Sequence, residues 1–230
     1  MSMSKKFQTY TRPWIKRETV IDKKKRAARV VHTLEKSYPN AHMALQYRTR
    51  IQLLVAVMLS AQCTDKKVNE VTVPLFKKYK TVKDFANAKQ AVFEKEIYQT
   101  GFYRAKAKNI IAACKKIEAD FSGRLPRAMA QILTLPGVAR KTANVVLGNA
   151  YGVVDGIAVD THVSRIAQRL GLTKNTSPEK IEQELMKLFP KKEWFAFTYR
   201  VINHGRAICE AKKPKCGTCL LRKLCPSALA

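Results

Sequence analysis

Lys141 is the residue best placed to act as a nucleophile. It lies in the segment LPGVARKTA, residues 135–143, where proline and glycine end one helix and a second helix begins. In the first turn of that second helix, the positive end of the helix dipole and the neighbouring Arg140 both favour a neutral amine. A neutral lysine held in a buried site can attack a sugar carbon. The alternative role of Lys141 is to neutralise a phosphate, and local spacing does not separate the two.

Asp160 is a carboxylate that could work with such an amine. It interrupts the apolar segment IAVDTHV, residues 157–163, directly before another expected helix. Its simplest role is therefore the N-cap of that helix. A carboxylate beside a glycosidic bond also stabilises positive charge on the sugar and can accept the proton of the lysine. One aspartate can serve both purposes.

Four cysteines close to the C-terminus form a third candidate site. Their spacing, C-x6-C-x2-C-x5-C, lets one loop wrap a single site, and the residues are Cys209, Cys216, Cys219 and Cys225. Four thiolates suit zinc or a 4Fe-4S cluster, but the spacing matches neither the paired knuckles of a zinc ribbon nor a ferredoxin. Disulfides are a third possibility, which a reducing compartment disfavours. Spacing alone leaves cluster and zinc open.

The helices that must position these groups can be read from apolar residues at helical spacing. Three core stripes stand out: Ile51, Leu54, Val55, Met58 and Leu59; Ile110, Cys114, Ile117 and Phe121; Ile181, Leu185, Leu188 and Phe189. Strand signals are few, and we interpret residues 153–159 as an extended connection. Residues 1–26 have the composition of a flexible basic arm. The sequence therefore predicts an all-α protein.

Residues 126–150 predict a helix-hairpin-helix. Its second helix would pack through Ala143, Val146, Leu147 and Ala150. The first amides of that helix have no intrahelical partner, so they can bind a phosphate oxygen whatever the base sequence. An ordinary connection between two helices is the alternative interpretation.

The charge of the chain indicates a polyanionic partner. Its 230 residues hold 44 Lys and Arg against 17 Asp and Glu, a net charge of +27. Residues 1–26 contribute only +7 of this, so the basic character belongs mainly to the remainder. Nucleic acid is the favoured partner, and an anionic membrane surface is the main rival. There is no apolar segment of about 20 residues and no secretory signal, so we expect a cytoplasmic protein.

From about residue 27 to Cys225 the chain closely resembles the endonuclease III family of DNA glycosylases. The resemblance rests on five motifs: LSAQCTD at 59–65, the hairpin at 135–143, VDTH at 159–162, NHGR at 203–206 and the four cysteines. It implies a two-domain helix-hairpin-helix fold. A six-helix barrel domain would span residues 43–154, and an iron-sulfur domain would combine residues 27–42 with 155–230. It also implies that the cysteines hold a 4Fe-4S cluster.

The resemblance further implies a bifunctional DNA glycosylase and abasic-site lyase that removes oxidised pyrimidines. Lys141 would displace the base, form a Schiff base at the deoxyribose C1′ and nick the strand by β-elimination, with Asp160 assisting. Because the target base must leave the stack, Gln62 and Phe102 would fill the gap. Their alternative roles are a polar residue at a helix end and a core aromatic. The implied DNA-binding residues are Gln62, Phe102, Gly137, Val138, Ala139, Arg140, Thr142 and His162.

Some features separate this chain from related possibilities. Ala139 stands where the hairpin of the family often has a second glycine, which could alter the turn. An adenine-mismatch enzyme would lack a lysine at position 141, whereas a pyrimidine-dimer glycosylase is not excluded. A noncatalytic DNA-binding protein with the same hairpin is the rival of a different class. We expect a monomer that acts on double-stranded DNA with damaged bases or abasic sites, associates with the nucleoid and does not bind membranes.

Overall fold

The structure, a computed structural model, describes residues 10–229. All regular elements in this range are helices and none is a strand, which confirms the predicted all-α class. Residues 153–159 form the extended connection expected from the sequence. No helix in the described range is long and apolar enough to cross a membrane.

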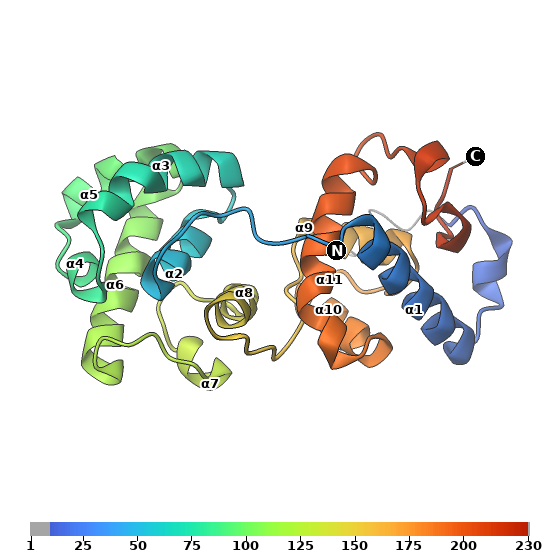
Figure 1. Cartoon of the computed structure of the whole chain (residues 1–230), viewed down its shortest axis with the longest axis horizontal. Helices are drawn as coiled ribbons and strands as arrows, with labels where there is room; N and C mark the ends of the chain where they lie inside the picture. The colour runs from blue at the N-terminus through green and yellow to red at the C-terminus, as the bar shows by residue number, and fades with distance from the viewer. Residues whose placement is uncertain (1–9, 230) are drawn as a thin grey trace, which may run out of the picture. The chain divides into compact units, whose positions relative to one another are not determined.

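The chain divides into two compact units (Figure 1). Unit 1 combines residues up to 43 with residues from 156 onward, and unit 2 comprises residues 44–155. The two ends of the chain thus build one unit, and the middle builds the other.

Unit 2 contains seven α-helices and one 3-10 helix in residues 44–155. They are α2 (Arg50–Leu59), α3 (Asp65–Lys78), α4 (Val82–Ala86), α5 (Gln90–Glu96), η2 (Tyr98–Thr100), α6 (Tyr103–Phe121), α7 (Met129–Ile132) and α8 (Arg140–Tyr151). Helices α4 and α5 pack on α6, while α2 contacts α3, α6 and α8. Every residue from 51 to 59 is buried, so α2 is the central helix of the unit.

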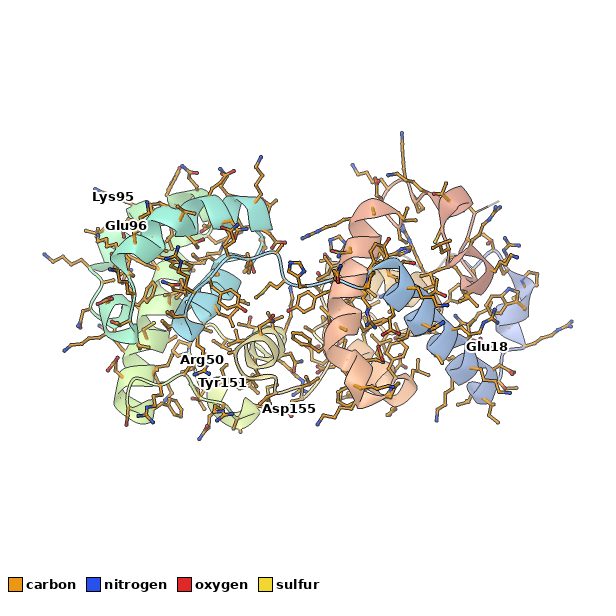
Figure 2. All side chains as sticks on the ribbon, viewed as in Figure 1. Glu18, Arg50, Lys95, Glu96, Tyr151 and Asp155 are labelled. Carbon is orange, nitrogen blue, oxygen red and sulfur yellow. The ribbon has the colours of Figure 1, made fainter. Side chains whose placement is uncertain are left out.

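The N-terminal end of α2 is joined to the C-terminal end of α8. The Arg50 guanidinium lies over the Tyr151 ring, 4.6 Å from its centroid, and its Nε donates to the Ala150 carbonyl at 3.1 Å (Figure 2). Val146 and Leu147 of α8 are fully buried, as the predicted stripe requires. These contacts fix the helix that carries Lys141 against the core of unit 2.

Unit 1 is built mainly from α1 (Val20–Ser37), α9 (Thr161–Arg169), α10 (Pro178–Leu188) and α11 (Lys191–Ala207). Short 3-10 helices occur at η1 (Pro13–Lys16), η3 (Cys216–Thr218) and η4 (Arg222–Leu224). Helix α1 lies beside α11 although more than 150 residues separate them in sequence (Figure 1). Their shared core includes Val30, Leu34, Phe197 and Val201.

The N-terminal segment differs from the flexible arm expected up to residue 26. Helix α1 begins at Val20, where Thr19 and Asp22 form a reciprocal capping box. Before it, the Thr11 hydroxyl donates to the Ala228 carbonyl at 2.8 Å, so this segment lies along the C-terminus of the chain. Residues 1–9 of the expected arm lie outside the described residues.

Arg26 gives the physical reason for this difference. Its side chain is buried and pairs with Glu18, with Nε 2.6 Å from the carboxylate, next to the N-terminal end of α1 (Figure 2). It also donates to the carbonyls of Leu170 at 2.5 Å and Leu224 at 3.2 Å. The basic composition predicted a solvated side chain, but the Arg26 guanidinium binds a carboxylate and two carbonyls that lie more than 140 residues later in the chain.

Candidate active site

The predicted hairpin forms between α7 and α8, and α7 is a single turn that begins at Met129. The chain turns at Gly137, whose φ is +75°. A Cβ at this position would lie 2.8 Å from Cβ of Asn109 on α6, so both the backbone conformation and the close packing require glycine. The turn is closed by the Val138 amide, which donates to the Leu135 carbonyl at 3.1 Å.

Lys141 is the second residue of α8. The preceding residue Ala139 is the N-cap and offers no side-chain hydrogen bond to the helix. The Ala143 amide, which donates to the Ala139 carbonyl at 2.9 Å, closes the first turn. The amides before it are therefore in the position where a helix binds an anion. Ala139 has φ −91° and ψ 169°, an extended conformation that does not require the second glycine of the family.

The side chains around Lys141 are solvent-accessible. Lys141 is exposed, so the burial expected of an amine nucleophile is not found in the protein alone. Arg140 is half-buried and its Nη2 lies 3.5 Å from the Asp155 carbonyl, while Thr142 is also half-buried. Val138 differs from Ala139, Arg140, Lys141 and Thr142 because its side chain is buried, and its amide closes the turn.

Gln62 and Phe102 are brought together with the hairpin in unit 2. Both line one cavity with Gly137, and the same cavity is bordered by Lys106 and Asn109 of α6. Gln62 has φ 53° and Phe102 has φ 47°, in the left-handed region that few non-glycine residues adopt. Phe102 is 66% exposed, which excludes the alternative of a core aromatic.

Asp160 lies in unit 1, where it caps α9. Its Oδ1 accepts a hydrogen bond from the Val163 amide at 2.8 Å, as the simplest interpretation predicted. The cap fixes the carboxyl group at the start of the helix and uses one of its two oxygens. Asp160 is half-buried, so part of the group reaches solvent.

His162 and Gly205 are neighbours in unit 1, and sequence reasoning missed this pair. Nδ1 of His162 lies 3.1 Å from Nη2 of Arg165, which also donates to the Gly205 carbonyl at 3.3 Å. A Cβ at Gly205 would lie 2.4 Å from Nδ1 of His162. The glycine of the NHGR segment therefore makes room for these two side chains. The segment itself was the only available signal.

The four C-terminal cysteines line a single cavity in unit 1. Cys209 follows α11, Cys216 begins η3, and Cys219 and Cys225 directly follow η3 and η4. All four are half-buried and unpaired by disulfides. As the side chains stand, no three His, Cys, Asp or Glu residues in the described range are arranged to hold one metal ion.

The surroundings of these thiols fit a cationic centre bound by thiolates. Burial and the nearby thiols raise the pKa of Cys225 to about 12, and burial likewise raises the pKa of Cys219. Thiolates at these positions therefore need a positive charge close by. A hydrogen bond also stabilises a thiolate here, because Nη1 of Arg169 donates to Sγ of Cys209 at 3.3 Å. The donor set thus matches a four-thiolate site.

Known proteins similar to this chain define the class to which its fold and site belong. The family model described as HhH-GPD superfamily base excision DNA repair protein matches residues 55–191. A curated relative, endonuclease III of Synechocystis, is 54% identical over 90% of this chain and 95% of its own. Endonuclease III of Bacillus subtilis is 44% identical over 82% of this chain and 86% of its own. The chain belongs to the endonuclease III family of the HhH-GPD superfamily.

Solved structures agree with this assignment. A non-covalent endonuclease III–DNA complex matches with a TM-score of 0.85 and 42% identity, covering 89% of this chain and 96% of the other. A trapped endonuclease III–DNA covalent intermediate matches equally well. A thermostable thymine-DNA glycosylase, 24% identical with a TM-score of 0.80, shares the fold. The chain is a DNA-binding glycosylase and abasic-site lyase of base excision repair, as predicted.

Proposed function

We propose that the enzyme removes oxidised pyrimidines and that Lys141 is its nucleophile. The observation that carries the role of Lys141 is its position: the side chain is exposed in the first turn of α8, beside backbone amides that can bind a phosphate. A phosphate bound there would bring the adjoining deoxyribose to the amine. DNA bound over Lys141 would exclude water from the amine, which is exposed to solvent in the protein alone. The covalent intermediate trapped for a 42% identical relative supports the same chemistry.

The reaction balances with residues of this chain alone. The Lys141 amine attacks C1′, the glycosidic C–N bond breaks, and the base departs with its electron pair and takes a proton. The nitrogen lone pair then opens the sugar ring: the C1′–O4′ bond breaks with its electron pair, O4′ takes a proton, and a protonated Schiff base forms at C1′. Removal of a C2′ proton then expels the 3′ phosphate by β-elimination. Asp160 stabilises positive charge on the sugar and accepts the amine proton.

The other candidate site residues of unit 2 are proposed to bind the DNA. Gln62 and Phe102 would enter the duplex where the base has left, since both side chains are exposed. Gly137, Ala139, Arg140 and Thr142 would contact the backbone at the hairpin. Val138 would contribute through packing, because its side chain is buried. In unit 1, His162 would contact DNA beside the α9 terminus. Such an enzyme would be found on chromosomal DNA.

A 4Fe-4S cluster is proposed for the cysteine-lined cavity. The four cysteines on one cavity, the donor from Arg169 and the family membership all support it. When bound, the cluster would link the four cysteines across residues 209–225 and so stabilise that part of unit 1. The purified protein should be brown and contain iron and acid-labile sulfide. A colourless protein with one equivalent of zinc would instead show a structural zinc site.

Borohydride trapping tests the role of Lys141. The protein is incubated with a duplex that contains an abasic site or thymine glycol, and sodium borohydride reduces any Schiff base to a stable adduct. We expect an adduct for the native protein and for Lys115→Gln, an exposed control on α6, and none for Lys141→Gln. Trapping that persists in Lys141→Gln would overturn the assignment. Duplexes with a pyrimidine dimer or an adenine mismatch, run in parallel, test the substrate class.

A further inference from the structure

We propose that Lys106 is a positioning residue that locks together the two loops carrying Gln62 and Phe102, so that both enter the duplex as one unit. The inference rests on the proposed function of these two residues. It concerns a group that does not itself touch the DNA.

Lys106 is an unusual lysine because it is buried in α6, with 6% of its surface exposed. Its Nζ donates to the carbonyls of Leu59 and Thr100, each at 2.8 Å. Its hydrogen-bond partners are thus two backbone carbonyls rather than a carboxylate. Burial lowers the pKa of Lys106, which reflects the free-energy cost of an ammonium in this place.

The two carbonyls belong to the two loops in question. Leu59 is the last residue of α2, three residues before Gln62, and its carbonyl is one that a helix C-terminus leaves unpaired. Thr100 ends η2, two residues before Phe102. A cation here also suits the negative end of the α2 dipole. One side chain therefore joins segments that lie about 40 residues apart in sequence.

Both loops contain backbone strain that needs an anchor. Gln62 and Phe102 have positive φ angles, and each costs about 1–2 kcal/mol for a non-glycine residue. Such conformations persist only where neighbouring contacts hold them. The Lys106 hydrogen bonds fix the chain two or three residues before each strained residue. Without them, each loop could relax independently.

Helix α6 also supports the hairpin, one turn further along. Asn109 packs against Gly137, where a Cβ would be only 2.8 Å from the Asn109 Cβ. Lys106 and Asn109 border the same cavity as Gln62, Phe102 and Gly137. A single helix therefore sets the distance between the two inserting side chains and the phosphate-binding turn.

This role predicts a defect that depends on the form of the DNA. In a duplex, extrusion of the target leaves a gap that the two side chains must fill. In a single strand there is no stacked partner to displace, so Lys141 can react without them. Loss of Lys106 should thus slow the reaction on duplex DNA and spare the reaction on single strands.

The experiment measures single-turnover borohydride trapping on one oligonucleotide that contains thymine glycol, alone and annealed to its complement. The ratio of duplex to single-strand rate is compared for the native protein, Lys106→Met, Lys106→Gln and the control Lys108→Met, an exposed lysine on the same helix. We expect the ratio to fall at least about tenfold in both Lys106 variants, the equivalent of one lost hydrogen bond to a charged group. Lys108→Met should keep the native ratio.

The other outcomes are distinct. Rates that fall equally on both DNA forms would show a merely structural role, and an unchanged ratio would show that the loops need no lock; either overturns the inference. Lys106→Gln retains a polar end group and serves if Lys106→Met does not fold. Failure of the native protein to trap on either DNA would instead refute the proposed function of Lys141.

Discussion

Gly205 of α11 and His162 of α9 pack so closely that a Cβ on the glycine would lie 2.4 Å from Nδ1 of the histidine. Arg165 and Ile166 are nearly as near, with atoms 3.0 and 3.1 Å from the same point. The two helices of unit 1 thus meet through a residue without a side chain. Asp160 begins one of these helices, so the contact also supports the position of the candidate carboxylate.

Gly205→Ala should therefore destabilise the protein. The added methyl group must displace a ring and a guanidinium that is itself hydrogen-bonded, at a cost of about 1–3 kcal/mol. Urea unfolding measures the change. Gly217→Ala is the matched control, because no atom lies within 4 Å of its Cβ position. Equal stability of the two variants would contradict the close contact.

Two substitutions of Asp160 separate its capping role from its chemistry. Asparagine caps helices about as well as aspartate, so Asp160→Asn should retain stability, whereas Asp160→Ala should lose about 1 kcal/mol. Both remove the carboxylate and should slow base excision by about 100-fold or more. Thermal unfolding and single-turnover excision give the two quantities. If Asp160→Asn excised the base at the native rate, Asp160 would act only as a helix cap.

Breaking the buried pair between Arg26 and Glu18 should have a large effect. Both side chains are 7% exposed, so Arg26→Met leaves a buried carboxylate without its partner and should cost about 3–5 kcal/mol. The double variant with Glu18→Gln should recover part of this loss. Lys67→Met removes an exposed pair with Glu70 and should cost less than about 1 kcal/mol. A small effect of Arg26→Met would argue against an ordered N-terminal segment.

Cys114 should be inert in the folded protein. Burial in the α6 core, with a smaller contribution from Glu118, raises the pKa of its thiol from 9.0 to about 12. Only a thiolate reacts with iodoacetamide, so at pH 8 the half-buried Cys63 should be alkylated and Cys114 spared until the chain unfolds. Peptide mass spectrometry after timed quenching distinguishes them. Labelling of Cys114 as fast as Cys63 would contradict its burial.

The same shift gives a pH dependence of stability. Between pH 9 and about 12 the folded state keeps the Cys114 proton while the unfolded state loses it. The free energy of unfolding should therefore fall as pH rises, by at most about 1.4 kcal/mol per pH unit from this group. Cys114→Ala should reduce the slope of that decline.

Sequence reasoning succeeded where a local pattern determines the structure. The stripe from Ile51 to Leu59 is buried, because a helix places residues of that spacing on one face. Pro136 and Gly137 located the hairpin turn, and the short spacing of the cysteines anticipated their shared cavity.

Contacts between distant parts of the chain were not predictable. Arg26 bonds a carbonyl 198 residues away, and no local pattern distinguishes it from the solvated lysines before it. Likewise, no local pattern distinguishes Lys106 from the exposed Lys108 on the same helix, because the Leu59 and Thr100 carbonyls that bind it come from other elements. Both side chains satisfy backbone carbonyls, which the sequence does not mark.

The pairing of α1 with α11 has a consequence for synthesis on the ribosome. Unit 2 is complete once residue 155 has emerged, and it can fold while translation continues. Helix α1 emerges first but must wait for the last third of the chain before its apolar face is covered. During that interval this face stays uncovered, and slow translation beyond residue 155 should prolong its exposure.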